Sequence, residues 1–317
     1  MTDTRSAVHV VAGIVRDGAG CILLARRAPG KHLAGLWEFP GGKRECGESS
    51  LDTLTRELHE ELGIRVESAQ PLICVPWNYP EKRVLLDVWE VVAYSGMPTS
   101  REGQALAWID QPMLDDVSMP AADRPVITAL RLPRQYLITP PLDDGRSDAV
   151  LKGLQAALAT GIRLIQLRLP GWPRERLAVM ARAARDLARE HDARLLLNAD
   201  WQLAVTLGLA GAHLPARIAA GMASRPRGLE WLAVSCHDET ELAVALRLDA
   251  DFVTLSPIRP TPDHVGAHPL GWSGLAGLSA NFPLPIYALG GVGIADLESA
   301  RQAGAHGIAA IRGLWPA

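Results

Sequence analysis

Residues 42–64 read GKRECGESSLDTLTRELHEELGI, and this stretch decides the fold of the first half of the chain. It predicts a helix over 49–62, because Ser49 can cap the helix and Asp52 completes a capping box three residues later. Gly63 stands where a left-handed C-terminal cap is expected. Leucines at helical spacing predict the buried stripe of the helix: Leu51, Leu54, Leu58 and Leu62.

The opposite face of this helix is acidic. Arg56, Glu57, Glu60 and Glu61 are spaced i, i+1, i+4 and i+5 and share that face. Three neighbouring carboxylates repel one another unless a divalent cation or the arginine neutralises them. Oxygen ligands favour hard cations, so the pattern indicates a site for Mg²⁺ or Mn²⁺. The alternative interpretation is a solvated acidic face that binds nothing.

The whole stretch resembles the Nudix box, G-x5-E-x7-R-E-U-x-E-E-x-G-U with U aliphatic, at every fixed position. The resemblance is closer to the MutT branch, the 8-oxo-dGTP pyrophosphohydrolases, and covers about residues 6–131. Three further stretches look like that branch: 26–43 with LWEFPGGK at 36–43, REGQ at 101–104, and MPAADRPVI at 119–127. The resemblance implies attack of water at the β-phosphorus of a nucleoside triphosphate, which gives a monophosphate and pyrophosphate.

The resemblance also implies the roles of individual residues. The expected metal ligands are the Gly41 carbonyl and the carboxylates of Glu57, Glu60, Glu61 and Glu102. Glu102 would bind metal or act as general base, and Arg56 would hold the glutamates in place. The expected substrate-binding residues are Arg27, His32, Glu38, Phe39, Pro40, Gly41, Val84 and Asp123. Among these, Arg27 and His32 would contact phosphate or sugar oxygens, and Phe39 and Val84 would wall the base pocket.

Asp123 departs from the family pattern, which has asparagine at this position. An amide donates to guanine O6 and accepts from the N7–H of the 8-oxo form, whereas an ionised carboxylate only accepts. Asp123 is therefore expected to meet the base edge with altered selectivity. A helix N-cap is the alternative role for this residue.

The rest of the first domain, placed at 1–132, alternates strand-like runs with turns. Strands are expected at 8–16, 21–27, 72–77 and 84–94, with a hairpin turn at Asp17-Gly18 and a last helix over about 122–131. This order predicts an α+β domain with a mixed sheet and one catalytic helix.

The second domain, placed at 133–317, repeats a strand–helix rhythm. Strands are expected at 136–139, 164–169, 194–198, 211–214, 232–237, 252–256, 286–290 and 307–312, with helices such as 174–190 and 239–246 between them. This pattern predicts a (β/α)8 TIM barrel, and an open doubly wound sheet is the competing architecture.

This domain resembles thiamine-phosphate synthase and the related thiazole tautomerases over about residues 135–315. Matching stretches include YLIT at 136–139, IQLR at 165–168, GAHL at 211–214 and ALGGV at 288–292. The resemblance implies a phosphate or ligand site made by Gln166, Arg168, Asn198, Ser235, Thr261, Gly290, Gly291 and Arg312. The alternative is that these residues only build the barrel and its turns.

Several residues that the synthase needs for a pyrimidine diphosphate and Mg²⁺ are replaced. The positions of the expected lysine, metal-binding aspartate, second acidic residue, loop threonine and lysine, and phosphate-loop serine are occupied by Pro170, Ala199, about Ile218, Asp263, His264 and Arg312. These changes remove cations and carboxylates that would stabilise a departing pyrophosphate. We therefore expect synthase activity to be lost, with a thiamine-related phosphate as the remaining ligand of the barrel.

Composition limits the remaining function classes. The chain has 317 residues and a net charge of −3, and neither half is basic enough to hold a nucleic acid polymer. The four cysteines lack metal-site spacing and predict reduced thiols. The absence of a signal peptide and of an uninterrupted apolar run predicts a cytoplasmic protein without a membrane partner.

Three functional hypotheses follow. The first is a nucleotide-pool cleaning enzyme whose barrel binds, regulates or supports. In the second, the hydrolase acts on a thiamine-pathway diphosphate or analogue, and the barrel recognises or makes a thiazole or pyrimidine phosphate. The third makes the barrel a sensor that binds thiamine phosphate without turnover.

Overall fold

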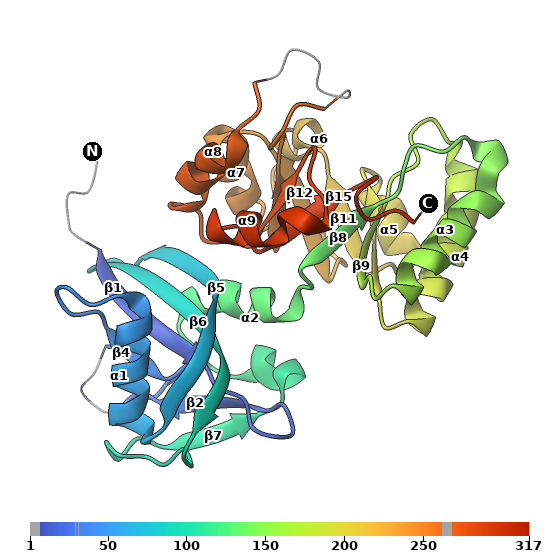
Figure 1. Cartoon of the computed structure of the whole chain (residues 1–317). Helices are drawn as coiled ribbons and strands as arrows, with labels where there is room; N and C mark the ends of the chain where they lie inside the picture. Colours follow the sequence, from blue (N-terminus) through green and yellow to red (C-terminus); the bar gives the residue numbers. More distant parts are fainter. Residues whose placement is uncertain (1–6, 29, 31, 262–267, 317) are drawn as a thin grey trace. The chain divides into compact units, whose positions relative to one another are not determined.

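The computed structural model describes residues 7–28, 30, 32–261 and 268–316. The chain divides into two compact units, with the boundary between Arg131 and Leu132 (Figure 1). Among the helices that the structure describes, none combines the length and apolarity needed to span a lipid bilayer. Each unit has its own hydrophobic core, so the two are described separately.

The N-terminal unit contains two small β-sheets. Its strands are β1 (Val8–Ile14), β2 (Ile22–Arg26), β3 (Trp37–Glu38), β4 (Gly41–Lys43), β5 (Arg65–Asn78), β6 (Arg83–Ser95) and β7 (Leu106–Ile109). One sheet has the order β4-β1-β6-β5 and the other β3-β2-β7. β1 runs parallel to β6, whereas the other pairs are antiparallel. The predicted α+β fold with a mixed sheet is confirmed.

Side-chain alternation along β1 places one helix on each side of the larger sheet. Val11 belongs to the cluster that buries the leucines of α1 (Ser50–Leu62). Ala12 and Ile14, on the opposite face of the strand, belong to the cluster that contains α2 (Arg124–Arg131). Because successive side chains point to opposite faces, a single strand anchors both helices.

The predicted hairpin between 8–16 and 21–27 is only partly correct. The chain does turn after Asp17, whose side chain accepts hydrogen bonds from the backbone of Ala19 and Cys21. A single bridge joins Arg16 to Ile22, but β1 and β2 then diverge into different sheets. They diverge because β1 pairs with β4 and β6 while β2 pairs with β3 and β7. Short strands such as β3 escaped prediction because two to four residues carry no readable alternation.

The C-terminal unit is a closed barrel of parallel strands in the order β10-β11-β12-β13-β14-β15-β8-β9. The strands are β8 (Gln135–Ile138), β9 (Leu164–Leu167), β10 (Arg194–Asn198), β11 (Gly211–Leu214), β12 (Trp231–Cys236), β13 (Phe252–Leu255), β14 (Ile286–Leu289) and β15 (Gly307–Ala310). The (β/α)8 prediction is confirmed, and the open doubly wound sheet is wrong because β8 pairs with both β9 and β15.

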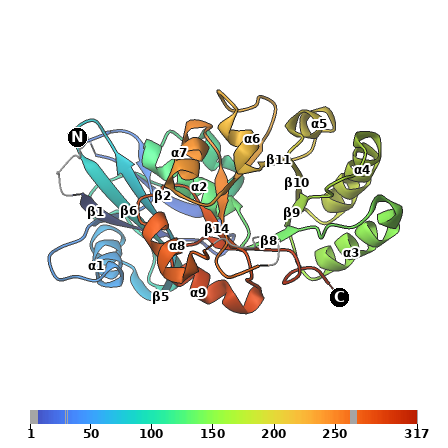
Figure 2. The ribbon, with the colours of Figure 1, turned by 90° about the horizontal axis from the view of Figure 1, so that it is seen from above.

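Helices follow the barrel strands along the chain and surround them in Figure 2. They are α3 (Ser147–Ala159), α4 (Arg174–Glu190), α5 (Trp201–Thr206), α6 (Ala216–Ala220), α7 (Glu239–Arg247), α8 (Gly271–Ser279) and α9 (Leu297–Gln302). The barrel interior is filled by aromatic rings, with Tyr136, Phe252 and Tyr287 packed at centroid distances of 5.4–5.5 Å. Because these rings fill the barrel interior, a ligand site is expected at the carboxyl ends of the strands.

Two fully buried threonines of the barrel make a matched stability test. Thr139 Oγ donates to the Arg168 carbonyl at 2.9 Å and accepts from the Arg168 N–H at 2.8 Å. Thr254 Oγ has no hydrogen-bond partner among the described residues. We expect Thr254→Val to leave stability unchanged or raise it by about 1 kcal/mol, and Thr139→Val to lower it by about 1–3 kcal/mol. Equal losses in chemical denaturation would contradict this assignment.

Candidate functional site

The acidic helix α1 is built as its sequence predicts at both ends. Ser49 and Asp52 form a reciprocal capping box, and Gly63 caps the C-terminus with φ 73°. Leu54, Leu58 and Leu62 are fully buried. The prediction for Leu51 is wrong, because this side chain is 43% exposed and Thr53 is buried in its place. Thr53 fits because its hydroxyl bonds Glu48 and the Ser49 carbonyl.

Arg56 is the centre of the hydrogen bonding on the acidic face. Its Nη1 donates to Glu57 at 2.9 Å and to Glu60 at 3.2 Å. Its Nε and Nη2 donate to the two oxygens of Glu48 at 2.7 and 3.0 Å, and Nη2 also donates to the Lys43 carbonyl at 3.1 Å. These bonds lower the pKa of Glu48 to about 2. Sequence reasoning left Glu48 without a role, although it is a fixed position of the box.

Glu57 and Glu61 are the half-buried carboxylates of this face. Burial raises the pKa of Glu57, and repulsion from Glu60 and Glu102 acts in the same direction. Burial also raises the pKa of Glu61 to about 7, assisted by the charges of Glu102, Glu57 and Glu38. The face therefore holds more negative charge than its environment stabilises, which is the condition under which a cation binds.

The strand β4 approaches this face closely. Gly41 has φ 149°, and a Cβ there would overlap the Val11 carbonyl oxygen, so only glycine fits. Its N–H donates to Glu61 Oε2 at 3.2 Å. A Cβ at Gly42 would overlap the carboxyl group of Glu57. The glycine pair thus lets β4 lie against these two half-buried carboxylates, with a backbone hydrogen bond to Glu61.

The donor set fits a hard divalent cation. The oxygens of Glu57, Glu60 and Glu61 project from one helix face, and their mutual repulsion favours an added positive charge. In the conformation described for residues 7–28, 30, 32–261 and 268–316, no three His, Cys, Asp or Glu side chains already converge on one point. Arg56 accounts for this, since it holds Glu57 and Glu60 in ion pairs.

Glu102 lies in the loop that follows β6, and its charge raises the pKa of both Glu57 and Glu61. The structure therefore brings this loop to the acidic face. Backbone hydrogen bonds from Thr99 to the Leu62 carbonyl and from Arg101 to the Glu61 carbonyl, each 3.0 Å, fasten the loop to the end of α1.

The predicted substrate-binding residues form a second group. Arg27 pairs with Glu38 and donates through Nε to the His32 carbonyl at 2.7 Å. The His32 ring packs edge-on against Tyr79 with centroids 5.4 Å apart. Phe39 and Val84 are buried in one apolar cluster, against which Tyr79 and Trp77 pack. Pro40 is also buried, and its carbonyl accepts from Gly13. Tyr79 was missed because a lone aromatic carries no motif.

Asp123 is buried at this second group, only 5% exposed. It lies in a 3₁₀ helix, Ala121–Asp123, directly before α2. Burial raises its pKa to about 8, with a further rise from the charge of Glu38 and an opposing effect of Arg27. Burial therefore favours the neutral carboxyl group, which can both donate and accept.

All eight barrel residues predicted from the sequence line a single cavity of about 670 Å³: Gln166, Arg168, Asn198, Ser235, Thr261, Gly290, Gly291 and Arg312. Each comes from a strand end or from the loop that follows a strand. This is the end of the barrel where parallel βα units place their ligands.

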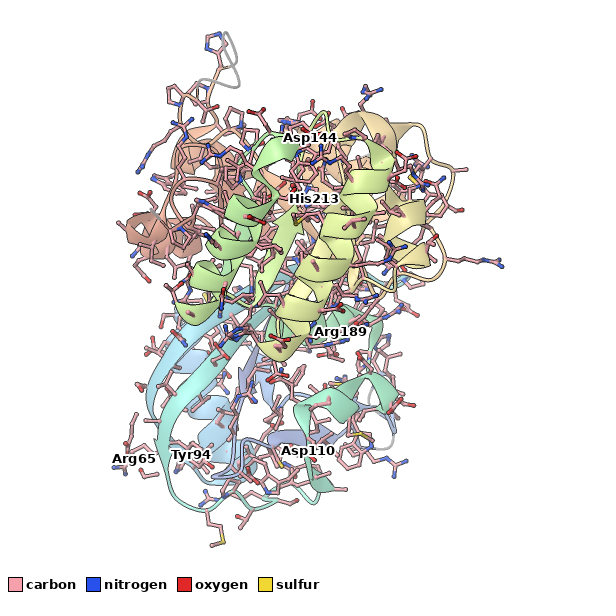
Figure 3. All side chains as sticks on the ribbon, turned by 90° about the vertical axis from the view of Figure 1, so that its right-hand side faces the viewer. Arg65, Tyr94, Asp110, Asp144, Arg189 and His213 are labelled. Atoms are coloured by element: carbon pink, nitrogen blue, oxygen red, sulfur yellow. The ribbon has the colours of Figure 1, made fainter. Side chains whose placement is uncertain are left out.

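A chain of hydrogen bonds runs from the barrel interior to this cavity. Gln166 Nε2 donates to the Tyr136 hydroxyl at 3.4 Å, which lies 3.0 Å from His213 Nδ1. His213, labelled in Figure 3, lies 2.8 Å through Nε2 from Ser235 Oγ. Burial lowers the pKa of His213 to about 3, so its ring is neutral. Sequence reasoning assigned the two ends of this chain but no role to Tyr136 or His213.

Some of the positions at which residues expected for the synthase are replaced lie in or beside this cavity. Pro170 and Arg312 line it, and Ala199 follows Asn198 in a left-handed conformation with φ 69°. Asp263 and His264 lie outside the described residues. Aspartate or asparagine adopts this conformation more readily than alanine does. The local backbone thus still suits the carboxylate that the sequence lacks.

Two family models match the chain. The model described as thiamine monophosphate synthase matches residues 135–314, and the NUDIX domain model matches residues 11–129. Fold and site together define a two-domain chain that joins a Nudix hydrolase to a thiamine-phosphate-synthase-like barrel. The chain belongs to the thiamine monophosphate synthase family through its second domain and to the MutT-like Nudix hydrolases through its first.

Two relatives, one for each half of the chain, support this assignment. The 8-oxo-dGTP diphosphatase of Escherichia coli is 34% identical over 39% of this chain and 96% of its own length. The thiamine-phosphate synthase of Bordetella pertussis is 36% identical over 57% of this chain and 87% of its own length. A solved thiamine phosphate pyrophosphorylase from Pyrococcus furiosus is similar at 21% identity over 61% of this chain and 88% of that one, with a TM-score of 0.48.

The buried carboxyl group of Asp123 predicts a pH-dependent stability. Between the ordinary aspartate pKa of 3.8 and about 8, the folded protein keeps a proton that the unfolded chain has released. Stability therefore falls as pH rises through this window. Asparagine does not titrate, so we expect the Asp123→Asn melting temperature to exceed that of the wild type by an increment that grows from pH 5 to pH 8.

Scanning calorimetry across that pH range measures the increment. Asp116→Asn, at an exposed aspartate of the same unit, is the matched control. Parallel melting curves of wild type and Asp123→Asn at every pH would show that the buried carboxyl group does not titrate as assigned.

Proposed function

We propose that the first domain is a divalent-cation-dependent nucleoside triphosphate pyrophosphohydrolase. The observation that carries the proposal is the pair of half-buried, mutually repelling carboxylates Glu57 and Glu61 at the glycine-rich strand β4. Glu57, Glu60, Glu61, Glu102 and the Gly41 carbonyl would hold Mg²⁺ or Mn²⁺. When bound, the cation neutralises the triphosphate oxygens and so permits approach of a nucleophile.

The chain's own groups supply the remaining chemistry. Glu102 accepts a proton from the attacking water as general base. Arg56 orients Glu57 and Glu60 and neutralises part of their negative charge. Arg27 and His32 contact the phosphate or sugar oxygens, with Arg27 oriented by its ion pair to Glu38. The products are a nucleoside monophosphate and pyrophosphate.

The base pocket favours an oxidised purine, and we propose 8-oxo-dGTP as the substrate. Phe39 and Val84 provide apolar walls, and neutral Asp123 can accept from N7–H while donating to O6. The relative from Escherichia coli described above is an 8-oxo-dGTP diphosphatase, which supports this choice. The enzyme would remove the oxidised nucleotide from the pool before it is built into DNA.

Steady-state pyrophosphate release with Mg²⁺ from 8-oxo-dGTP, dGTP and a thiamine-type diphosphate tests the proposal. We expect the largest kcat/KM for 8-oxo-dGTP and a loss of about 10²-fold or more in kcat for Glu57→Gln. Faster turnover of the thiamine-type diphosphate would instead favour the alternative, in which the hydrolase serves the pathway of the barrel.

Asp123→Asn tests the pocket itself. A neutral acid can carry its proton on either oxygen, whereas an amide presents one fixed donor, so we expect the variant to keep turnover and sharpen discrimination against dGTP. The wild type should also lose kcat/KM for 8-oxo-dGTP relative to the variant above pH 8, where the carboxylate ionises. Unchanged selectivity ratios would remove Asp123 from the base pocket.

We infer that the second domain, residues 133–317, binds a phosphate ester of a small heterocycle without making thiamine phosphate. The cavity retains Arg168 and Ser235, Arg312 stands in place of a serine, and Pro170 and Ala199 replace a cation and a metal ligand. Neutral hydrogen-bonding groups and two guanidinium groups suit a monophosphate better than a diphosphate with Mg²⁺. The active site is therefore degenerate as a synthase.

Titration calorimetry of the full chain with thiamine phosphate and with a thiazole phosphate tests the inference. We expect binding that does not depend on Mg²⁺ and that Arg168→Ala weakens about tenfold or more. Formation of thiamine phosphate from the pyrimidine diphosphate and thiazole phosphate would overturn the inference and make the barrel a synthase.

A further inference from the structure

The loop of residues 99–104 is fastened to the end of α1 by an unusually complete set of hydrogen bonds. The last carbonyls of a helix have no partner within the helix. Here the Leu62 carbonyl accepts from Thr99 N–H at 3.0 Å, and the Glu61 carbonyl accepts from Arg101 N–H at 3.0 Å. The His59 carbonyl accepts from Arg101 Nη1 at 3.3 Å as well as from the Gly63 N–H.

One side chain of this loop, Gln104, uses both ends of its amide. Its Oε1 accepts from the Ser100 hydroxyl at 2.9 Å and from the Glu102 N–H at 3.0 Å. Its Nε2 donates to the Glu61 carbonyl at 3.1 Å. Gln104 therefore connects the backbone of Glu102 directly to the backbone of Glu61.

We propose that Gln104 is a positioning residue that holds Glu102 at the acidic face of α1. The inference rests on the proposed function, in which Glu102 removes a proton or binds the cation. Glu102 is an exposed residue of this loop, and the residue after it, Gly103, has φ 76°. A short exposed loop does not hold a carboxylate to within a fraction of an ångström unless another group fixes its backbone.

The chemistry of the contact requires glutamine in particular. The Glu102 N–H and the Ser100 hydroxyl need an acceptor, whereas the Glu61 carbonyl needs a donor. A glutamate would keep the first contacts and place a second carboxylate oxygen against the Glu61 carbonyl. An aliphatic residue of similar size would lose all three bonds.

A double-mutant cycle separates positioning from a general structural role. We expect Gln104→Leu to lower kcat for pyrophosphate release about 10–100-fold with KM changed less than about threefold, because a small displacement of a reacting group costs rate rather than binding. In the Glu102→Ala background, Gln104→Leu should cost less than about twofold further. Gln70→Leu, at a half-buried glutamine bonded to Glu90, is the matched control.

Hydrogen exchange of the full chain gives a readout that does not depend on turnover. Gln104→Leu should speed exchange of the Glu102 amide about tenfold or more, since that N–H loses its acceptor. Gln104→Glu should keep this amide protected and still lower kcat, because only the bond to the Glu61 carbonyl is lost.

The outcomes distinguish the inference from the function on which it rests. A wild type that releases no pyrophosphate from any nucleotide overturns the proposed function, while amide exchange still tests the Gln104 contact. An active wild type in which the losses of Gln104→Leu and Glu102→Ala multiply overturns the inference. So does an unchanged exchange rate at Glu102.

Discussion

Charge compensation on one face of α1 is the constraint on which the N-terminal unit depends. Glu57, Glu60 and Glu61 project together, and burial makes ionisation of Glu57 and Glu61 costly. Within the chain the compensating charge comes from Arg56, which is itself oriented by both oxygens of Glu48. The guanidinium reaches its partners through five donors in a planar fork, a geometry that lysine cannot reproduce. A cation bound at this face would add to the neutralisation of the carboxylates that Arg56 already provides.

The positions of the elements around α1 are set by their contacts with this helix rather than by their own sequence preferences. The glycine pair Gly41–Gly42 allows the close approach of β4, because a Cβ at Gly42 would displace the Glu57 carboxyl group and one at Gly41 would overlap the Val11 carbonyl. The loop carrying Glu102 ends at the carbonyls that α1 leaves unpaired. The hydrogen bonds that cap the C-terminal end of α1 also hold the loop that carries Glu102. We therefore expect substitutions that weaken this cap to displace the Glu102 carboxylate.

Features that depend on local periodicity can be predicted from the sequence. Features that depend on tertiary contacts cannot. The capping box of α1 and the strands Arg194–Asn198 and Gly211–Leu214 match the predicted residues, because cap chemistry and apolar runs are local. Leu51 has helical spacing but lies at the edge of the buried stripe, where solvent reaches it. Neither the neutral state of Asp123 nor the contacts of Gln104 can be read from spacing, since both depend on segments distant in the chain.

The barrel keeps a cavity at which several residues expected for the synthase are replaced. Ala199 keeps a left-handed backbone that costs alanine about 1–2 kcal/mol. The conformation persists because its N–H donates to the His213 carbonyl at 2.9 Å, and the next residue, Asp200, caps α5. Barrel closure therefore fixes this turn, and no bound cation is needed for it. These contacts hold the backbone beside Asn198, which lines the cavity.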